Sequence, residues 1–488
     1  MASLNRLLLW SALALAAVCW SAGAAARDQT DEAPDVLRSE ATQQTTEYRF
    51  STGDAKLLDE IQRGCFNYLW NEVHPASGLV KDRRTHAVCS LAGVGFQLSA
   101  LPTGVERGWI TREQGQERAL SVLRTLASRA DNRKFGVFLH FVDLETGGVL
   151  PGRQSEVAST IDHALFLAGA LPAAEYFGGE VATRIDQLYE ATNWKAFDVA
   201  EGGFISMGWQ PEQTALSGPG EFVPWNWHFA SDEERLVYFL AAGAPRAEFA
   251  GEPHDYYRLQ RHVKRHDQMD PYVVSWNGSL FTYLFAHLWI DYRALAADDP
   301  SRFGIERPRV DWFENSRRAT LTHRQRCIEA ADRFATLAKD HWGFAPCMGL
   351  NEHGRPVYLV QSLRPSIEDK DRWDGGTVAP YAAGSAIMFT PAESMAALRA
   401  YRELKDSDGE PLVWRDPAAG GYGLADSFNL DQQHASDDNV AIDVGPMLLA
   451  IENARTGLVW RLFMQHAAAK RAVAALQLTP FNRVEILP

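Results

Sequence analysis

Acidic side chains occur at three points where a carboxyl group is costly unless it is used. Asp232 and Glu233 begin one apolar stretch, and Asp162 lies early in another, with Glu156 in the glycine-rich approach to it. Asp443 stands inside a third apolar run. Glycosidic bonds are cleaved by two carboxyl groups, one of which protonates the leaving oxygen while the other activates water or attacks carbon. We therefore examine these acids for that chemistry.

The first two acidic stretches also have a purely structural interpretation. Ser231 and Ser159 precede them and could each cap a helix. Acids in the first turn of a helix are favoured by the positive end of its dipole. The residues alone therefore leave helix capping and catalysis open at both places.

Asp443 has alternatives of its own. A carboxyl in an apolar run is either paired, for example with Arg455, or functional. Nearby, Asp437, Asp438 and Asn439 could bind calcium, but their spacing matches no calcium loop that we recognise.

Flat aromatic rings are the second group that this chemistry would need. The sequence contains 15 Trp, and an indole ring covers the apolar face of a pyranose. We expect five of them, in polar or aromatic loops, to contact a sugar: Trp209, Trp225, Trp227, Trp276 and Trp373. Further polar residues that we expect near a substrate are His140, His287 and Asp374, and other loop acids are Asp143 and Asp426.

Other reaction types lack support in the sequence. It has no Gly-x-Ser-x-Gly, no phosphate-binding loop, no dinucleotide fingerprint and no His-Glu-x-x-His. The formal net charge of −14 argues against nucleic acid and against docking on anionic lipid. An uncharged substrate fits this charge better.

The N-terminus has the pattern of an export signal. Residues 1–26 combine Arg6, an apolar run and a run of small residues, so we expect a signal peptide and a periplasmic or secreted protein. Residues 27–50 are polar and predict a flexible segment. Four cysteines remain after the signal, and both disulfides and buried thiols are compatible with them: Cys65, Cys89, Cys327 and Cys347.

Helical periodicity dominates the rest of the chain. Leu58, Ile61, Cys65 and Leu69 fall on one helical face. Capping boxes are predicted at Thr111 with Gln114 and at Thr390 with Glu393. We expect further helices near 87–101, 159–177, 180–193, 232–243, 278–298, 315–338, 440–453 and 457–476, and one short strand near Val357–Val360.

Long connections rich in glycine, proline, aromatic and acidic residues recur between these helices. They fall at about 74–86, 135–156, 198–230, 341–377 and 413–439. Long loops in a compact domain are usually functional. The pattern favours an all-α fold of the α/α toroid type, with paired helices and the site in the loops at one end. We expect residues 51–488 to form a single domain.

The sequence resembles a known family, the bacterial glycoamylase-like domain proteins, which include endo-β-1,2-glucanases and sophorose-releasing relatives. The likeness runs from about residue 54 to 470 and rests on many segments in one order. They include 90–96, 107–112, 159–162, 232–233, 242–245, 289–293, 311–316, 374–377, 451–453 and 457–460.

The resemblance implies an (α/α)6 toroid that hydrolyses β-1,2-glucosidic bonds, with inversion and without a metal or organic cofactor. It assigns a catalytic acid to Glu233, with Asp232 where relatives carry Asn, and a second catalytic position to Asp162. Glu156 stands near a further family acid, with one extra residue of spacing. The chain departs at 283–289, where of a longer family motif only His287 and Trp289 remain.

We therefore expect a monomeric, carboxylate-based hydrolase of β-glucan, most of all of β-1,2-glucan, with an oligo- or polysaccharide as its partner. Transglycosylation of the same glucan and non-catalytic glycan binding remain alternatives. An uronate lyase on a similar toroid would need a basic groove, which the negative net charge disfavours.

Overall fold

The computed structural model describes residues 36–37, 48–152, 156–199, 202–211 and 220–481. The predicted signal peptide lies outside these residues. The helices are α2 (Thr52–Asn71), α3 (Leu91–Glu106), α4 (Arg112–Ala127), α5 (Thr160–Phe177), α6 (Gly179–Glu190), α7 (Asp232–Ala242), α8 (Pro253–Arg258), α9 (Trp312–Glu329), α10 (Pro380–Ser385), α11 (Pro391–Glu403), α12 (Ala441–Thr456), α13 (Leu458–Gln465) and α14 (Ala467–Ala475).

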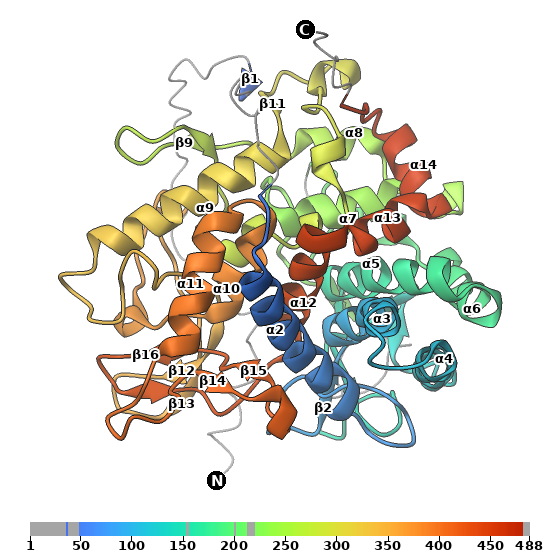
Figure 1. Cartoon of the computed structure of the whole chain (residues 1–488). Coiled ribbons are helices and arrows are strands. Elements are labelled where there is room, and N and C mark those ends of the chain that lie inside the picture. Colours follow the sequence, from blue (N-terminus) through green and yellow to red (C-terminus); the bar gives the residue numbers. More distant parts are fainter. Residues whose placement is uncertain (1–35, 38–47, 153–155, 200–201, 212–219, 482–488) are drawn as a thin grey trace, which may run out of the picture.

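A row of neighbouring helices forms the centre of the molecule. Its order is α10, α12, α3, α5 and α7, each in contact with the next. Helices α3, α5 and α12 are buried on nearly every side, whereas α4, α6 and α11 bury one face only. In Figure 1 α3, α5 and α12 lie inside, and α4 and α6 lie towards the right-hand rim. Helices that are apolar all round belong to an interior, so the sequence itself sorts inner from outer helices.

Short strands connect the helices and shape the loops. They are β1 (Val36–Leu37), β2 (Val88–Ser90), β3 (Arg133–Lys134), β4 (Val137–Phe138), β5 (Phe141–Asp143), β6 (Ala158–Ser159), β7 (Gly208–Gln210), β8 (Glu221–Phe222), β9 (Val263–Lys264), β10 (Tyr272–Val273), β11 (Arg309–Val310), β12 (Cys347–Leu350), β13 (Pro356–Leu359), β14 (Trp414–Arg415), β15 (Gly423–Leu424), β16 (Phe428–Asn429) and β17 (His434–Ala435). The antiparallel sheet β6–β7–β8 has Ala158 opposite Trp209 and Trp209 opposite Phe222.

Several helices begin at the positions that their N-terminal capping residues predict. Thr111 accepts a hydrogen bond from the backbone of Gln114, whose side chain accepts one from the backbone of Thr111. Helix α5 starts after Ser159, whose Oγ accepts from the backbone N–H of Asp162 at 3.4 Å. Helix α11 starts at Pro391, but Thr390 gives no side-chain cap and instead donates to the carbonyl of Ala386.

Three predicted helices differ in the structure. Residues 278–298 form only short 3-10 turns, η4 (Leu280–Tyr283), η5 (Ala286–Leu288) and η6 (Tyr292–Ala294), so the predicted helix there is wrong. The helix predicted over 315–338 ends at Glu329, and the one predicted over 457–476 is broken at His466. The strand predicted near Val357–Val360 is confirmed as β13.

The remaining expectations concern the N-terminal segment, the cysteines and membranes. Val36–Leu37, inside the segment expected to be flexible, pairs in parallel with Arg309–Val310. All four cysteines of the described part are buried free thiols, which decides between the two readings left open above. Over the same residues, no helix is both long and apolar enough to span a bilayer.

Candidate active site

Three consecutive acids occupy the first turn of α7 and are held very differently. Arg235 and the backbone N–H of Ala286 both donate to the buried carboxylate of Asp232, the second at 3.1 Å. Ser231 does not cap the helix as predicted, because its hydroxyl donates to the buried carboxyl of Glu234. Glu233 remains partly exposed, and it has no hydrogen bond or ion pair among the described residues. Glu233 is therefore the acid of this turn that is available to a ligand.

The surroundings of Glu233 favour its protonated form. Desolvation raises the pKa of Glu233 well above its usual value, and the charges of Glu234, Asp162 and Asp232 raise it further. Burial also raises the pKa of Asp232 to about 6 and that of Glu234 to about 7. A carboxyl that keeps its proton near neutral pH can act as a general acid.

Asp162 lies close enough to Glu233 for its charge to raise the pKa of Glu233. One carboxyl oxygen of Asp162, Oδ1, lies 3.5 Å from Nε2 of His140. The other, Oδ2, is buried without a hydrogen-bond partner in the described structure. Because buried carboxyl oxygens are normally hydrogen-bonded, the free oxygen points to a water or substrate group as its partner.

The start of α5 is tied to the segment that leads into α7. The indole N–H of Trp227 donates to Thr160 Oγ1 at 2.8 Å, and Thr160 Oγ1 donates to the carbonyl of Ser206 at 3.0 Å. Tyr238 on α7 donates to the carbonyl of Trp227 at 2.9 Å. These bonds fix Asp162 and Glu233 relative to one another.

Glu156 lies just before β6 and is partly exposed. Its carboxyl accepts from the backbone N–H of Val157 at 3.3 Å. It borders residues 153–155, which lie outside the described structure.

Two further acids form a pair that the sequence analysis did not connect. The carboxyls of Asp426 and Asp443 are both buried, and each acts on the pKa of the other, so the two titrate as a pair. Burial raises the pKa of Asp426 to about 7 and that of Asp443 well above its usual value. The predicted alternative of an Asp443–Arg455 pair is wrong, because Arg455 binds Asp59 at 2.8 Å.

Asp82 links this pair to the acids of α5 and α7. Burial raises its pKa, while Arg83, at 3.7 Å, lowers it, and the charges of His140 and Asp162 act on it. Asp82 in turn raises the pKa of Asp443. The acids thus form one continuous electrostatic group. The sequence pattern did not single out Asp82, since it is one of many acids in predicted loops.

The predicted sugar contacts divide into buried and accessible residues. Trp209, Trp227 and His287 are 3%, 7% and 1% exposed, which differs from the expected open surfaces. Nε2 of His287 lies 2.9 Å from Ser316 Oγ inside the core. The remaining predicted residues are partly exposed or lie beside Asp162: Trp225, Trp276, Trp373, Asp374 and His140. Burial raises the pKa of Asp374 to about 6.

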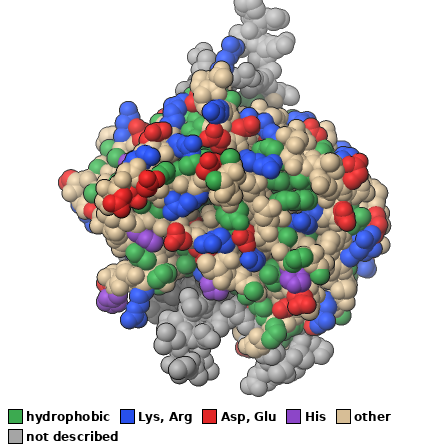
Figure 2. Space-filling model, turned by 60° about the horizontal axis from the view of Figure 1, so that its bottom comes forward, with side chains coloured by type: hydrophobic (Ala, Val, Ile, Leu, Met, Phe, Trp, Pro, Cys, Tyr) green, Lys and Arg blue, Asp and Glu red, His purple; other side chains and the backbone are tan. Residues whose placement is uncertain are grey.

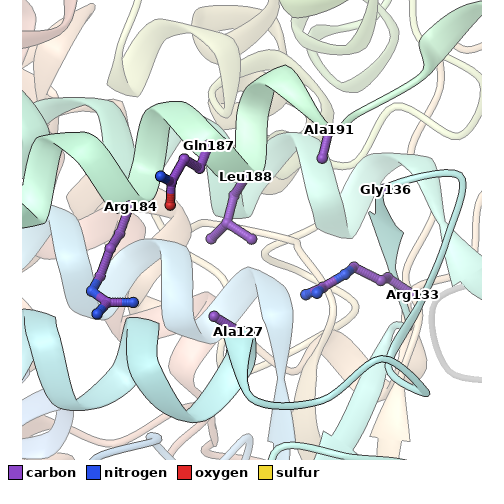
Figure 3. A pocket seen from close by; sticks show the side chains of 7 residues that line it. All are labelled: Ala127, Arg133, Gly136, Arg184, Gln187, Leu188 and Ala191. Carbon is purple, nitrogen blue, oxygen red and sulfur yellow. The ribbon is translucent and has the colours of Figure 1, made fainter.

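A separate pocket of about 190 Å³ lies between α4 and α6, and Figure 3 shows its lining. Arg133 and Arg184 flank it, and none of the predicted site residues lines it. Arg133 donates to the carbonyl of Leu126, and Arg184 binds Glu180 at 2.8 Å. Both cations therefore already have partners, and the pocket is distinct from the acidic group.

The groups that could hold a metal lie elsewhere. In the described part of the chain, one cluster of three suitable side chains occurs, at the surface: His266, Asp267 and Glu329. Asp438, considered above for calcium, instead accepts hydrogen bonds from the backbone and hydroxyl of Thr85.

The face of the molecule shown in Figure 2 carries acidic and basic side chains mixed together, and its hydrophobic side chains lie in small groups.

Comparison with known proteins relates this chain to a family of carbohydrate-active proteins by sequence and by fold. The Glycoamylase family model, whose description reads "Putative glucoamylase", matches residues 224–467. An exo β-1,2-glucooligosaccharide sophorohydrolase (non-reducing end) from Parabacteroides distasonis is 28% identical over 457 residues, which cover 87% of this chain and 58% of that protein. The chain thus spans less than two thirds of the length of this curated relative.

Solved structures share the fold over nearly the whole chain. One from Bacteroides uniformis, with the same description as the family model, has a TM-score of 0.73 at 25% identity and covers 89% of this chain and 99% of that one. An endo-β-1,2-glucanase from Chitinophaga pinensis, in complex with sophorotriose and glucose, has a TM-score of 0.71 at 24% identity and covers 87% and 98%.

Proposed function

Because this chain belongs to the glycoamylase family, we propose that it is a glycoside hydrolase that cleaves β-glucan, with β-1,2-glucan as its substrate. The sophorohydrolase relative, alike over 87% of this chain, supports the linkage. We further propose that the row of buried helices is part of an (α/α)6 toroid, with the acidic group at the first turns of α5, α7 and α12 and in the adjoining loops, at one end of the toroid.

The placing of Glu233 carries the catalytic proposal. It is the partly exposed member of its acidic turn, and its surroundings raise its pKa. In the proposed reaction Glu233 donates its proton to the glycosidic oxygen as the bond from that oxygen to the anomeric carbon breaks. A water molecule adds to the anomeric carbon and gives up its proton to a base.

Asp162 and Glu156 are the bases that we propose, and the water attacks from the face opposite the leaving group, with inversion. The unpartnered Oδ2 of Asp162 supports Asp162 over Glu156. The reaction as written needs only carboxyl groups and water, and we propose no cofactor. Export to the periplasm or beyond, and a monomeric state, belong to the same proposal.

Incubation of the purified protein with linear β-1,2-, β-1,3- and α-1,4-glucans tests this function, with products resolved by chain length and by new reducing ends. We expect shorter chains and new reducing ends from the β-1,2-glucan. Activity only on the α-glucan would overturn the substrate. Products longer than the substrate would mean transglycosylation, and binding without any product would mean a glycan-binding protein.

A further inference from the structure

The hairpin of β3 and β4 turns through two residues with a left-handed backbone, Phe135 at φ 52° and Gly136 at φ 82°. Such turns favour Asn, Asp or Gly at the first position, because a bulky side chain strains the backbone there. Left-handed geometry costs a non-glycine residue on the order of 1–2 kcal/mol. A phenylalanine at this position therefore lowers the stability of the folded protein through backbone strain. Its presence suggests that the ring serves a function.

The ring of Phe135 is not needed to fill the core. Phe135 is 42% exposed, whereas the other large hydrophobic residue exposed in the described structure, Val199, is aliphatic. The ring lies nearly parallel to that of Phe222 on β8, with centroids 6.2 Å apart and 10° between the planes. The two rings thus form one apolar patch, in which Phe135 is exposed and Phe222 is partly exposed. Phe197 packs edge-on against both rings from the interior.

A charged group borders this surface. The ammonium of Lys134 lies 5.0 Å from the ring centre of Phe135 and 4.3 Å from that of Trp209. An exposed apolar ring with an ammonium group beside it suits a pyranose, whose faces are apolar and whose rim carries hydroxyl groups.

The size of the surface favours a single sugar over a protein partner. A phenylalanine buries roughly 150–250 Å², so its exposed part here is on the order of 80 Å². A stable protein interface takes about 800 Å² from each partner.

The surface also lies within reach of the acidic group. Phe135 is five residues before His140, so the two are at most about 18 Å apart along the chain. His140 contacts Asp162. The partner ring Phe222 belongs to the sheet whose first strand ends at Ser159, the cap of the helix that carries Asp162.

We propose that Phe135 and Phe222 form an accessory platform that stacks on one glucosyl unit of a glucan chain outside the position of cleavage. The proposal rests on the proposed function for the identity of the sugar. It predicts that the platform acts on long chains and leaves the shortest substrates unaffected.

The test replaces Phe135 with Asn, which removes the ring and suits the left-handed turn, so relief of backbone strain offsets the lost contacts with Phe197 and Phe222 and the variant should fold. We expect KM for long β-1,2-glucan to rise about two- to tenfold with kcat unchanged, and no change for the shortest cleaved oligosaccharide. Phe135→Tyr should keep the wild-type KM. Gln477→Asn, at an exposed left-handed position with φ 51°, is the matched control and should change stability only.

Binding of long glucans to a Glu233→Gln protein, with and without Phe135→Asn, separates the two proposals. If the wild type cleaves no β-1,2-glucan, the proposed function fails, while weaker glucan binding by the double variant would still support the platform. Equal binding by both proteins would overturn the platform. A shift of oligomeric state in Phe135→Asn would also overturn it, since the ring would then serve a protein contact.

Discussion

Asp232, Glu233 and Glu234 are neighbours in the sequence, yet the structure gives each carboxyl a different environment. Asp232 binds the buried guanidinium of Arg235, and Glu234 accepts from Ser231. Glu233 has neither partner and reaches the surface. Because three acids in one helical turn repel one another, the two buried carboxyls also help to keep the third protonated.

Glu233→Gln should reduce kcat on the β-1,2-glucan by about 10²–10⁴-fold with little change in KM, since the amide keeps the shape but cannot donate the proton. Steady-state kinetics on a purified, folded variant measures this. In the wild type, activity needs protonated Glu233, so kcat/KM should fall as pH rises through a pKa well above 4.5.

Glu234→Gln is the matched control for this prediction, because it changes the adjacent acid, whose amide can still accept from Ser231. It should keep most of the activity. If Glu234→Gln were as inactive as Glu233→Gln, the assignment of the general acid to Glu233 would be wrong.

Sequence analysis identified individual acidic residues better than it identified which acids lie together in the fold. Glu233 and Asp162 each begin an apolar helix, a pattern that left capping and catalysis open, and the family resemblance singled them out. In the structure the charge of Asp162 acts on Glu233. The Asp426–Asp443 pair could not be found in this way, since Asp426 looks like any loop acid and only the fold places it against Asp443. Trp209 belongs to a segment that the sequence predicts as a polar loop. In the structure it lies on β7, which pairs with β6 at one edge and with β8 at the other, and its side chain is buried.

At the scale of elements, α3 and α5 approach through glycines rather than side chains. A Cβ on Gly169 of α5 would collide with the backbone of Gly95, and one on Gly95 would collide with that of Leu165. Close approach of these two helices holds the start of α5, with Asp162, at the centre of the molecule. The contact is therefore a structural condition for the site.

Gly169→Ala should lower the free energy of unfolding by about 1–3 kcal/mol, because the helices must move apart. Denaturant unfolding measures it. Gly53→Ala in α2 is the matched control, since its nearest neighbour would be Ser51 Oγ at 3.8 Å, and it should be neutral or stabilising by up to about 1 kcal/mol. Equal effects of the two changes would contradict the close helix contact.

Arg235 anchors α7 from beneath the acidic turn. Its guanidinium binds Asp232 and lies 3.9 Å from the ring centre of Trp312, and both charged groups are 1% exposed. Arg235→Met should cost about 3–5 kcal/mol, because it leaves Asp232 buried without a counter-charge. Arg246→Ala, which breaks the exposed pair with Glu248, should cost no more than about 1 kcal/mol. Similar losses in chemical denaturation would show that the buried pair has no special role.

The wrongly predicted helix at 278–298 shows how distant partners override a local pattern. The backbone N–H of Ala286 bonds to Asp232, and the carbonyls of His287 and Leu288 accept from Trp460 and Asn453. These groups would be needed for a continuous helix, and side chains far away in the sequence occupy them instead. Helices without such competition, such as α5 and α7, match their predicted ranges closely.

Across the described structure, many fully or partly buried carboxyls have raised pKa values, among them Glu233, Glu234, Asp374, Asp426 and Asp443. A folded state that holds a proton more tightly than the unfolded chain loses stability as pH rises between the two pKa values. Buried histidines act in the opposite sense: burial lowers the pKa of both His163 and His323 to about 3, so they reduce stability as pH falls below 6.5. The pH dependence of the stability of the wild type therefore contains contributions from both the carboxyls and the histidines.

Asp426→Asn isolates the acidic contribution. The amide oxygen can still accept from the backbone N–H of Met348, as Asp426 does at 2.7 Å, but the variant no longer has to ionise next to Asp443. The pKa of Asp426 is raised from 3.8 to about 7, so the wild type loses the stability of the protonated pair across this window. The Tm of the variant minus that of the wild type should thus increase from pH 5 to pH 8 in thermal unfolding. Glu352→Gln, at a side chain that is 85% exposed, should give a constant difference. A constant difference for Asp426→Asn as well would mean that the pair is not protonated in the folded protein.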